Sequence, residues 1–108
     1  MIVQLARPEN TDGIVRSIAL CAGSGSSVFK ELPQHVDVLF TGELSHHEVL
    51  AAVAKGQHVI LCGHTNTERG FLGFMRPILQ NNLDKELGPS KVEVKISTRD
   101  DDPIEIYI

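Results

Sequence analysis

Short apolar runs alternate with polar, glycine-containing loops along the first two-thirds of the chain. A short run that ends in a turn-forming stretch is typical of a buried strand. Three runs fit that description: residues 15–22, 36–40 and 58–62. We predict a short helix between the first two runs, with Ser26 or Ser27 as its N-cap and Pro33 at its end.

The next helix has the clearest boundaries. Ser45 followed by Glu48 matches a capping box, in which the two side chains satisfy backbone N–H groups of the first turn. Gly56 stands where a glycine commonly ends a helix. The apolar positions between these signals recur at helical spacing and form an apolar stripe: Val49, Leu50, Ala52 and Val53.

A longer helix is predicted further on, with Thr67 as its N-cap. Its apolar positions share one side: Phe71, Leu72, Met75, Ile78, Leu79, Leu83 and Leu87. Pro77 lies inside this stripe, and proline lacks the N–H that a helix interior uses. We therefore expect a kink or a late helix start at Pro77.

The C-terminal segment changes its hydrophobic period to two. Apolar and polar residues alternate over 91–97 and again over 104–108, as in half-buried strands. This pattern predicts two antiparallel strands joined by the loop 100–103, whose carboxylates we expect to be solvated, with no cationic neighbour beyond Arg99. The whole pattern predicts an α/β fold, a mixed sheet with helices on both faces.

Length and composition indicate one folded domain. The chain has 108 residues, and 42% of them are hydrophobic, which excludes bulk disorder. We expect residues 1–13 to be a lead-in or residual linker and residues 14–108 to be a single α/β domain. Fourteen acidic against ten basic residues argue against direct nucleic-acid binding or an anionic membrane surface as partner. No apolar run is long enough to cross a bilayer.

The two cysteines match neither a metal-binding motif nor a disulfide framework. Cys21 and Cys62 both lie inside apolar stretches, without the close spacing of a redox or zinc motif. We interpret them as small buried hydrophobic residues. A reducing, intracellular compartment is therefore expected.

Three polar loops follow the three predicted strands. They span residues 23–27, 41–47 and 63–69. In an open α/β sheet, ligands bind beyond the carboxyl ends of the strands. We therefore expect a functional site where these loops converge.

The loop 63–69 carries the sharpest candidate chemistry. His64 comes just after a strand, and Glu68 opens the following helix, so one turn can bring imidazole and carboxylate together. This pair suits zinc, iron or manganese, but two ligands are too few for a closed site. The alternative is a plain loop histidine and a carboxylate that favours the positive end of a helix.

The other two loops are more ambiguous. Glu43 lies between a strand end and a polar turn, where a structural role is hard to assign. His46 and His47 point about 100° apart on a helix and do not face one metal together. The stretch Gly23, Ser24, Gly25 and Ser26 is either a phosphate-binding nest or a plain glycine turn.

Three segments in order resemble one family. They are AGSGSS at 22–27, TGELSHH at 41–47 and GHTNTERGFL at 63–72. They are similar to the C-terminal part of the NIF-three-like proteins, named for NGG-one-interacting factor three, and resemble the eukaryotic branch most. The resemblance covers residues from 15 to the C-terminus.

The resemblance implies a NIF-three-like α/β fold, a ring-like homo-oligomer and a two-metal centre in a cleft. His64 and Glu68 match two of the metal ligands. Glu43 and His46 match positions that line the same cleft. The metals are unidentified divalent ions, with zinc, iron, manganese or magnesium as candidates. The family carries a label of GTP cyclohydrolase-like activity, and members are also described as partners of transcriptional regulators.

One departure from the family limits these expectations. The other metal ligands of the family come from an N-terminal half that this chain lacks, and the His46–His47 pair does not replace them. The chain therefore looks like a C-terminal domain or fragment with half of a two-metal site. We expect it to be inactive alone, because hydrolysis needs the complete centre.

Two functions remain open at this point. The first is metal-dependent hydrolysis of a nucleotide or phosphate-containing substrate, with Glu43 as general base or orienting group. Gly23, Ser24, Gly25, Ser26 and Arg69 would then hold a phosphate. The second is a metal-containing scaffold that binds a regulator of transcription. For either function we expect a cytoplasmic location, with the nucleus as an alternative.

Overall fold

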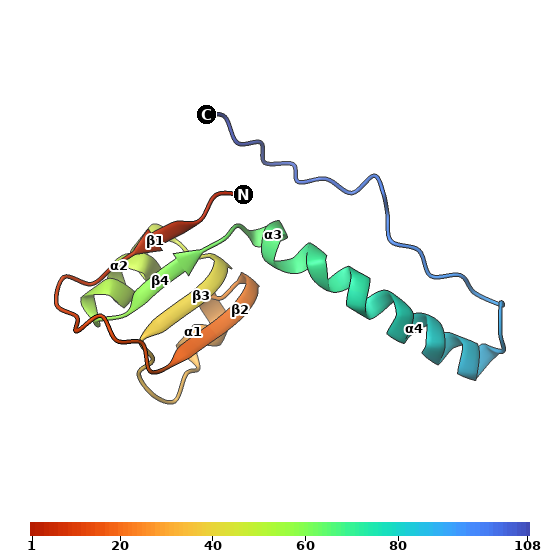
Figure 1. The fold of residues 1–108 in the computed structure, drawn as a ribbon, viewed down its shortest axis with the longest axis horizontal. Coiled ribbons are helices and arrows are strands. Elements are labelled where there is room, and N and C mark those ends of the chain that lie inside the picture. Colours follow the sequence, from red (N-terminus) through yellow and green to blue (C-terminus); the bar gives the residue numbers. More distant parts are fainter. The chain divides into compact units, whose positions relative to one another are not determined.

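A computed structural model describes residues 1–108, and the chain divides into two units, Met1–Glu68 and Arg69–Ile108. The first unit contains a sheet in the order β1-β4-β3-β2, which Figure 1 shows. Its strands are β1 (Gln4–Ala6), β2 (Ile18–Ser24), β3 (Val38–Glu43) and β4 (His58–Leu61). β2, β3 and β4 run parallel, and β1 pairs antiparallel with β4. The predicted mixed α/β class is thus confirmed.

The strand β1 lies inside the segment 1–13, where no strand was predicted. Its three residues pair with Val59, Ile60 and Leu61 of β4. Three residues are too few for a recognisable alternation, so the period-two signal is absent here. The domain boundary at residue 14 stays a prediction.

Three helices follow the parallel strands of the first unit: α1 (Ser26–Lys30), α2 (His46–Ala54) and α3 (His64–Glu68). The capping box of α2 is confirmed, because the Ser45 hydroxyl accepts from the Glu48 N–H at 3.2 Å and the Glu48 carboxylate accepts from the Ser45 N–H at 2.8 Å. Gly56 follows the C-cap of α2 with a φ of 82°. This left-handed conformation explains the glycine.

The N-cap of α1 differs from the prediction. Gly25 is the N-cap, and no side chain caps this helix. The Ser26 hydroxyl instead donates to Glu48 Oε2 at 2.9 Å. One carboxylate thus caps α2 and ties its first turn to α1.

The core of the first unit lies between the sheet and the helices α1 and α2. Its buried members are Val36, Leu39, Ala52 and Val59. Phe29 from α1 and Val49 from α2 pack against the same cluster. Both helices therefore cover the same face of the sheet.

The opposite face of the sheet carries a row of apolar side chains. The strand registers align Leu5 with Ile60, Ile60 with Phe40, and Phe40 with Leu20. Leu20 is 73% exposed and Leu5 is 49% exposed. Helices on both faces were predicted, but within this unit the second face has no helix over it.

The second unit begins with a short 3-10 helix, η1 (Arg69–Phe71), and continues with α4 (Leu72–Leu87). Thr67 is not the N-cap of a long helix, because α3 begins at His64 and contains it. Pro77 does not delay the helix, since α4 begins at Leu72 and runs past the proline. No helix of the chain has the length and apolar character needed to cross a membrane.

The predicted strands over 91–97 and 104–108 are wrong. Figure 1 shows the chain after α4 without helix or strand. A strand needs a hydrogen-bonded neighbour, and no other strand lies in this unit. The Gln80 side chain supplies the local bonds instead, donating to the Val92 carbonyl at 2.8 Å and accepting from the Val94 N–H at 2.8 Å.

Candidate metal centre

The three predicted loops meet at one edge of the sheet of the first unit. Because β2, β3 and β4 are parallel neighbours, their carboxyl ends share that edge. Glu43 is the last residue of β3, and His64 begins α3 just after β4. Gly23 lies near the end of β2. The prediction that the loops converge is confirmed.

His64 and Glu68 are both members of α3. Residues four apart on a helix lie on the same side, and here His64 Nε2 lies 3.2 Å from Glu68 Oε1. The predicted contact is present, but its local cause differs. A single helical turn joins the two residues, rather than a strand-to-helix turn.

Glu43 approaches the same imidazole from the neighbouring strand. Its Oε1 lies 2.8 Å from His64 Nδ1, so the ring stands between two carboxylates. The Glu43 hydrogen bond is the main cause that raises the pKa of His64, and the Glu68 charge adds to it. About half of each of these side chains is exposed, which screens their charges.

Gly23 makes room for this cluster. A Cβ atom on Gly23 would collide with the Glu68 carboxylate and lie 3.0 Å from His64 Nε2. Its φ of 67° is also unfavourable for any residue with a side chain. The backbone of β2 is therefore part of the wall of the site.

Two threonines hold this wall in place and were not predicted as site residues. Gly23 donates its N–H to the Thr67 hydroxyl at 2.8 Å. The buried Thr41 hydroxyl donates to the Gly23 carbonyl at 3.1 Å. Both belong to segments already singled out, but their contacts with Gly23 join residues 44 and 18 positions apart, so sequence spacing does not show them.

The remaining residues of the first loop do not join the cluster. Ser24 and Ser26 bond to each other at 3.3 Å, and Ser26 also donates to Glu48. Gly25 lies against the Phe29 ring and the Thr41 hydroxyl, where a Cβ would collide. This arrangement favours the plain glycine turn over a phosphate-binding nest.

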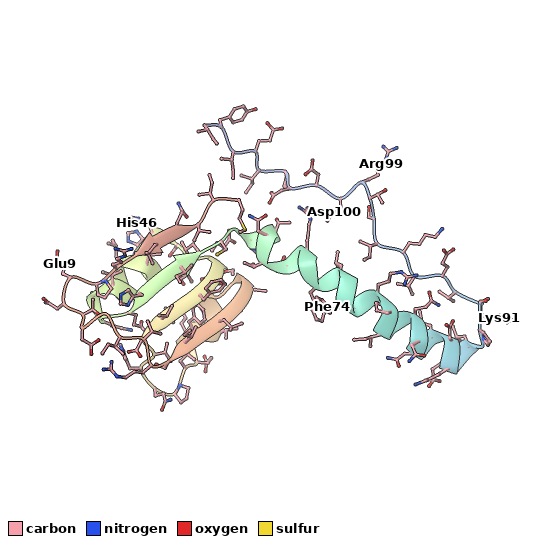
Figure 2. All side chains as sticks on the ribbon, in the orientation of Figure 1. Glu9, His46, Phe74, Lys91, Arg99 and Asp100 are labelled. Carbon is pink, nitrogen blue, oxygen red and sulfur yellow. The ribbon has the colours of Figure 1, made fainter.

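His46 and Arg69 are not part of the cluster of Glu43, His64 and Glu68 either. His46 is exposed in the first turn of α2, with its ring 6.2 Å from that of His47 (Figure 2). Within the second unit, Arg69 pairs with Asp100 through Nε–Oδ2 and Nη2–Oδ1 distances of 2.6 and 3.1 Å. The expectation that residues 100–102 have no cation beyond Arg99 is therefore wrong.

The donor atoms fit part of a metal site. An imidazole nitrogen and a carboxylate oxygen are ligands for zinc, iron and manganese, and a second carboxylate on the far ring nitrogen commonly orients a metal-bound histidine. No group of three or more His, Cys, Asp or Glu side chains in the chain is arranged to hold a metal. Glu43 and Glu68 contact opposite nitrogens of one ring, so they do not converge on a common point.

Known proteins match this chain over almost its whole length. A family model described as Duf34/NIF3 (NGG1p interacting factor 3) matches residues 2–103. The chain belongs to the NIF3 family. The resemblance found in the three motifs is thereby confirmed.

Relatives in the NIF3 family are much longer than this chain. A protein named NIF3 homolog from Schizosaccharomyces pombe is 48% identical over 103 residues, covering 94% of this chain and 36% of the relative. NGG1-interacting factor 3 from Saccharomyces cerevisiae is 43% identical and covers 97% and 34%. The chain thus spans about a third of the length of these two relatives.

Solved structures show the same fold. Staphylococcus aureus protein SA1388 has a TM-score of 0.72 and 25% identity, over 98% of this chain and 33% of its own. A Bacillus cereus protein related to NIF3 has a TM-score of 0.69 and 24% identity, over 99% and 28%. The NIF3-like fold is therefore confirmed for the region that this chain covers.

Proposed function

We propose that His64 and Glu68 supply two ligands to a divalent-metal centre, which the whole protein uses to hydrolyse a nucleotide or another phosphate-containing substrate. The supporting observation is the His64 imidazole, held between Glu43 and Glu68 beside a glycine wall. A bound divalent cation supplies acidified water and charge stabilisation for phosphate oxygens.

Glu43 prepares His64 for this role. A carboxylate that accepts from Nδ1–H keeps the ring proton on that nitrogen and leaves Nε2 for a metal. The same bond occupies Glu43 Oε1, which favours the orienting role over that of a general base. Glu68, on the other side of the ring, is the second ligand.

The structure gives less support to substrate contacts by Arg69 and the loop 23–27 than to the two metal ligands. Two guanidinium nitrogens of Arg69 already bond to Asp100, and the Gly23 N–H already donates to Thr67. Phosphate binding by these groups would require those bonds to break. The remaining ligands and substrate contacts then come from outside this chain, through the longer protein or a homo-oligomer.

Metal content of the purified chain tests the proposal. The protein is prepared without a metal-binding tag, titrated with Zn²⁺ and Mn²⁺, and analysed by inductively coupled plasma mass spectrometry. We expect weak binding, because two protein ligands leave an open site, and its loss in His64→Ala. His47→Ala, which removes an exposed histidine outside the cluster, is the matched control and keeps the metal. Equal binding by the parent and His64→Ala contradicts the proposal.

Hydrolysis is tested in the full-length protein. We expect Glu43→Gln to lower a nucleotide-hydrolysing activity measured as phosphate or product release under saturating metal. An activity that His64→Ala leaves unchanged contradicts the hydrolase proposal, even where metal still binds.

A regulatory scaffold is the second candidate. It is favoured by the name of the Saccharomyces cerevisiae relative, NGG1-interacting factor 3, which describes that protein as an interaction partner. For this function, His64→Ala disrupts the oligomer or the partner complex, and no substrate is turned over. Size-exclusion chromatography with light scattering measures that change.

A further inference from the structure

A groove lies between α1 and α2 on the helical side of the sheet. It has a volume of about 520 Å³ and combines apolar side chains, among them Phe29, Leu32, Leu39 and Leu44, with polar ones such as His35 and Gln57. Glu43, His64 and Glu68 do not line it. The groove is therefore separate from the candidate metal centre.

The charges around this groove oppose the charge of the molecule. The whole chain carries a net charge of −4, yet the groove is lined by Lys30 of α1 and Lys55 at the end of α2. Both lysines are exposed, and neither forms an ion pair in the structure. Glu48 is the one carboxylate in the lining.

Glu48 does not balance both lysines. Its Oε2 accepts from the Ser45 N–H and from the Ser26 hydroxyl. The bond from the Ser45 N–H is the main cause that lowers the pKa of Glu48, and the Lys30 ammonium group adds to it. Glu48 thus offsets one of the two lysines, and the lining keeps a net positive charge. The groove thus presents an apolar floor with cationic groups on two different walls.

We propose that the groove between α1 and α2 binds an acidic amphipathic helix of a protein partner. Such a helix places an apolar stripe in a hydrophobic groove and its charged residues along the rim. Lys30 and Lys55 stand on different elements, so they match carboxylates on both flanks of one apolar stripe. A single-headed anion would use only one of them. Charge complementarity therefore selects an acidic helix as the occupant.

The probe is a fluorescein-labelled helical peptide of about four turns, with leucines at helical spacing and glutamates on both flanks. Fluorescence anisotropy is measured with the 108-residue chain. We expect saturable binding that weakens as salt rises, because rim charges are screened. A matched peptide with lysines in place of the glutamates binds at least about tenfold more weakly.

Charge reversal locates the binding site. The double variant K30E/K55E weakens binding of the acidic peptide by about tenfold, while K91E, on the segment after α4, leaves it unchanged. Ala51→Phe places an aromatic ring in the groove from α2 and also weakens binding. Circular dichroism confirms that each variant is folded, and hydrogen exchange of the parent shows protection of α1 and α2 by the peptide.

Three results overturn the proposal. The first is equal affinity for the acidic and basic peptides. The second is binding that a folded K30E/K55E variant retains in full. The third is saturable binding of decanoate in the groove without binding of the acidic peptide, which assigns the site to a small amphiphile.

Discussion

The Nδ1 atom of His64 lies 2.8 Å from Oε1 of Glu43, although 21 positions separate the two residues in the chain. The contact exists because β3 and β4 are parallel neighbours whose ends lie at one edge of the sheet. It leaves Nε2 facing Glu68 on the other side of the ring. The arrangement joins a strand end to the first turn of a helix and defines the candidate metal centre.

Glu43→Gln tests the orienting role of the carboxylate. A neutral amide binds the Nδ1 proton more weakly and no longer stabilises the ring in its ligand orientation. We expect the affinity for Zn²⁺, measured by isothermal titration calorimetry, to fall by about ten- to a hundredfold. Glu86→Gln, on the exposed surface of α4, leaves the affinity unchanged. If Glu43→Gln bound Zn²⁺ with the affinity of the parent, Glu43 would not orient His64 for the metal.

Gly23→Ala tests the glycine wall, and Gly13→Ala is its matched control. Both glycines have positive φ, at 67° and 73°, but a Cβ on Gly13 meets nothing within 4 Å. Both substitutions cost about 1 kcal/mol or more of backbone strain. Gly23→Ala lowers the free energy of unfolding more than Gly13→Ala does, because its methyl group also displaces the Glu68 carboxylate. Urea unfolding measures both free energies, and equal losses would show that the space beside Glu68 is not required.

Leu39→Ala tests the assigned core. Leu39 is 5% exposed in the cluster between the sheet and the two helices. Removing its side chain is expected to lower the free energy of unfolding by about 2–5 kcal/mol. Leu50→Ala, at a position that is 54% exposed on α2, changes it by about 0.5 kcal/mol or less. Similar losses at the two positions would refute the assigned orientation of α2.

Asp37 gives the fold a pH dependence. Its Oδ2 accepts from the Arg16 N–H at 2.8 Å and the Ser17 N–H at 3.0 Å, and these bonds lower the pKa of the carboxyl group. Because the pKa of Asp37 is lower in the folded state than in the unfolded state, the carboxylate stabilises the fold at pH values above the unfolded pKa of about 3.9. This stabilisation is lost as the pH falls through the pKa of the folded state. Asp37→Asn is therefore less stable than the parent at pH 7, and the two converge in acid.

Urea unfolding at neutral and acidic pH measures this convergence. Glu9→Gln, an exposed carboxylate with no bond in the structure, is the control and tracks the parent at both pH values. A constant difference between Asp37→Asn and the parent across the titration would contradict the assignment.

Local signals predicted much of the first unit. The capping box at Ser45 and Glu48 and the glycine at position 56 are short-range features, and the structure contains both. The three parallel strands were found because each is an apolar run that ends in a turn. Their loops converge as the rule for parallel sheets requires.

The errors arise where structure depends on distant partners. Alternation over 91–97 predicts a strand, but pairing needs a neighbour that the second unit lacks. Arg69 looked available for a phosphate because its partner Asp100 lies 31 positions away. The Thr67 hydroxyl resembled a cap, yet it accepts from the Gly23 N–H. Sequence spacing contains none of these long-range contacts.

The central claim is that His64 Nε2 is a metal ligand while Glu43 holds the proton on Nδ1. Long-range ¹H–¹⁵N NMR of the histidine rings during a Zn²⁺ titration tests it most directly. We predict that the Nε2 resonance of His64 moves to the metal-bound range, that its Nδ1 stays protonated, and that His46 and His47 do not shift. The account would be contradicted if the ¹⁵N resonances of His64 stayed unchanged during the titration while those of His46 or His47 moved to the metal-bound range.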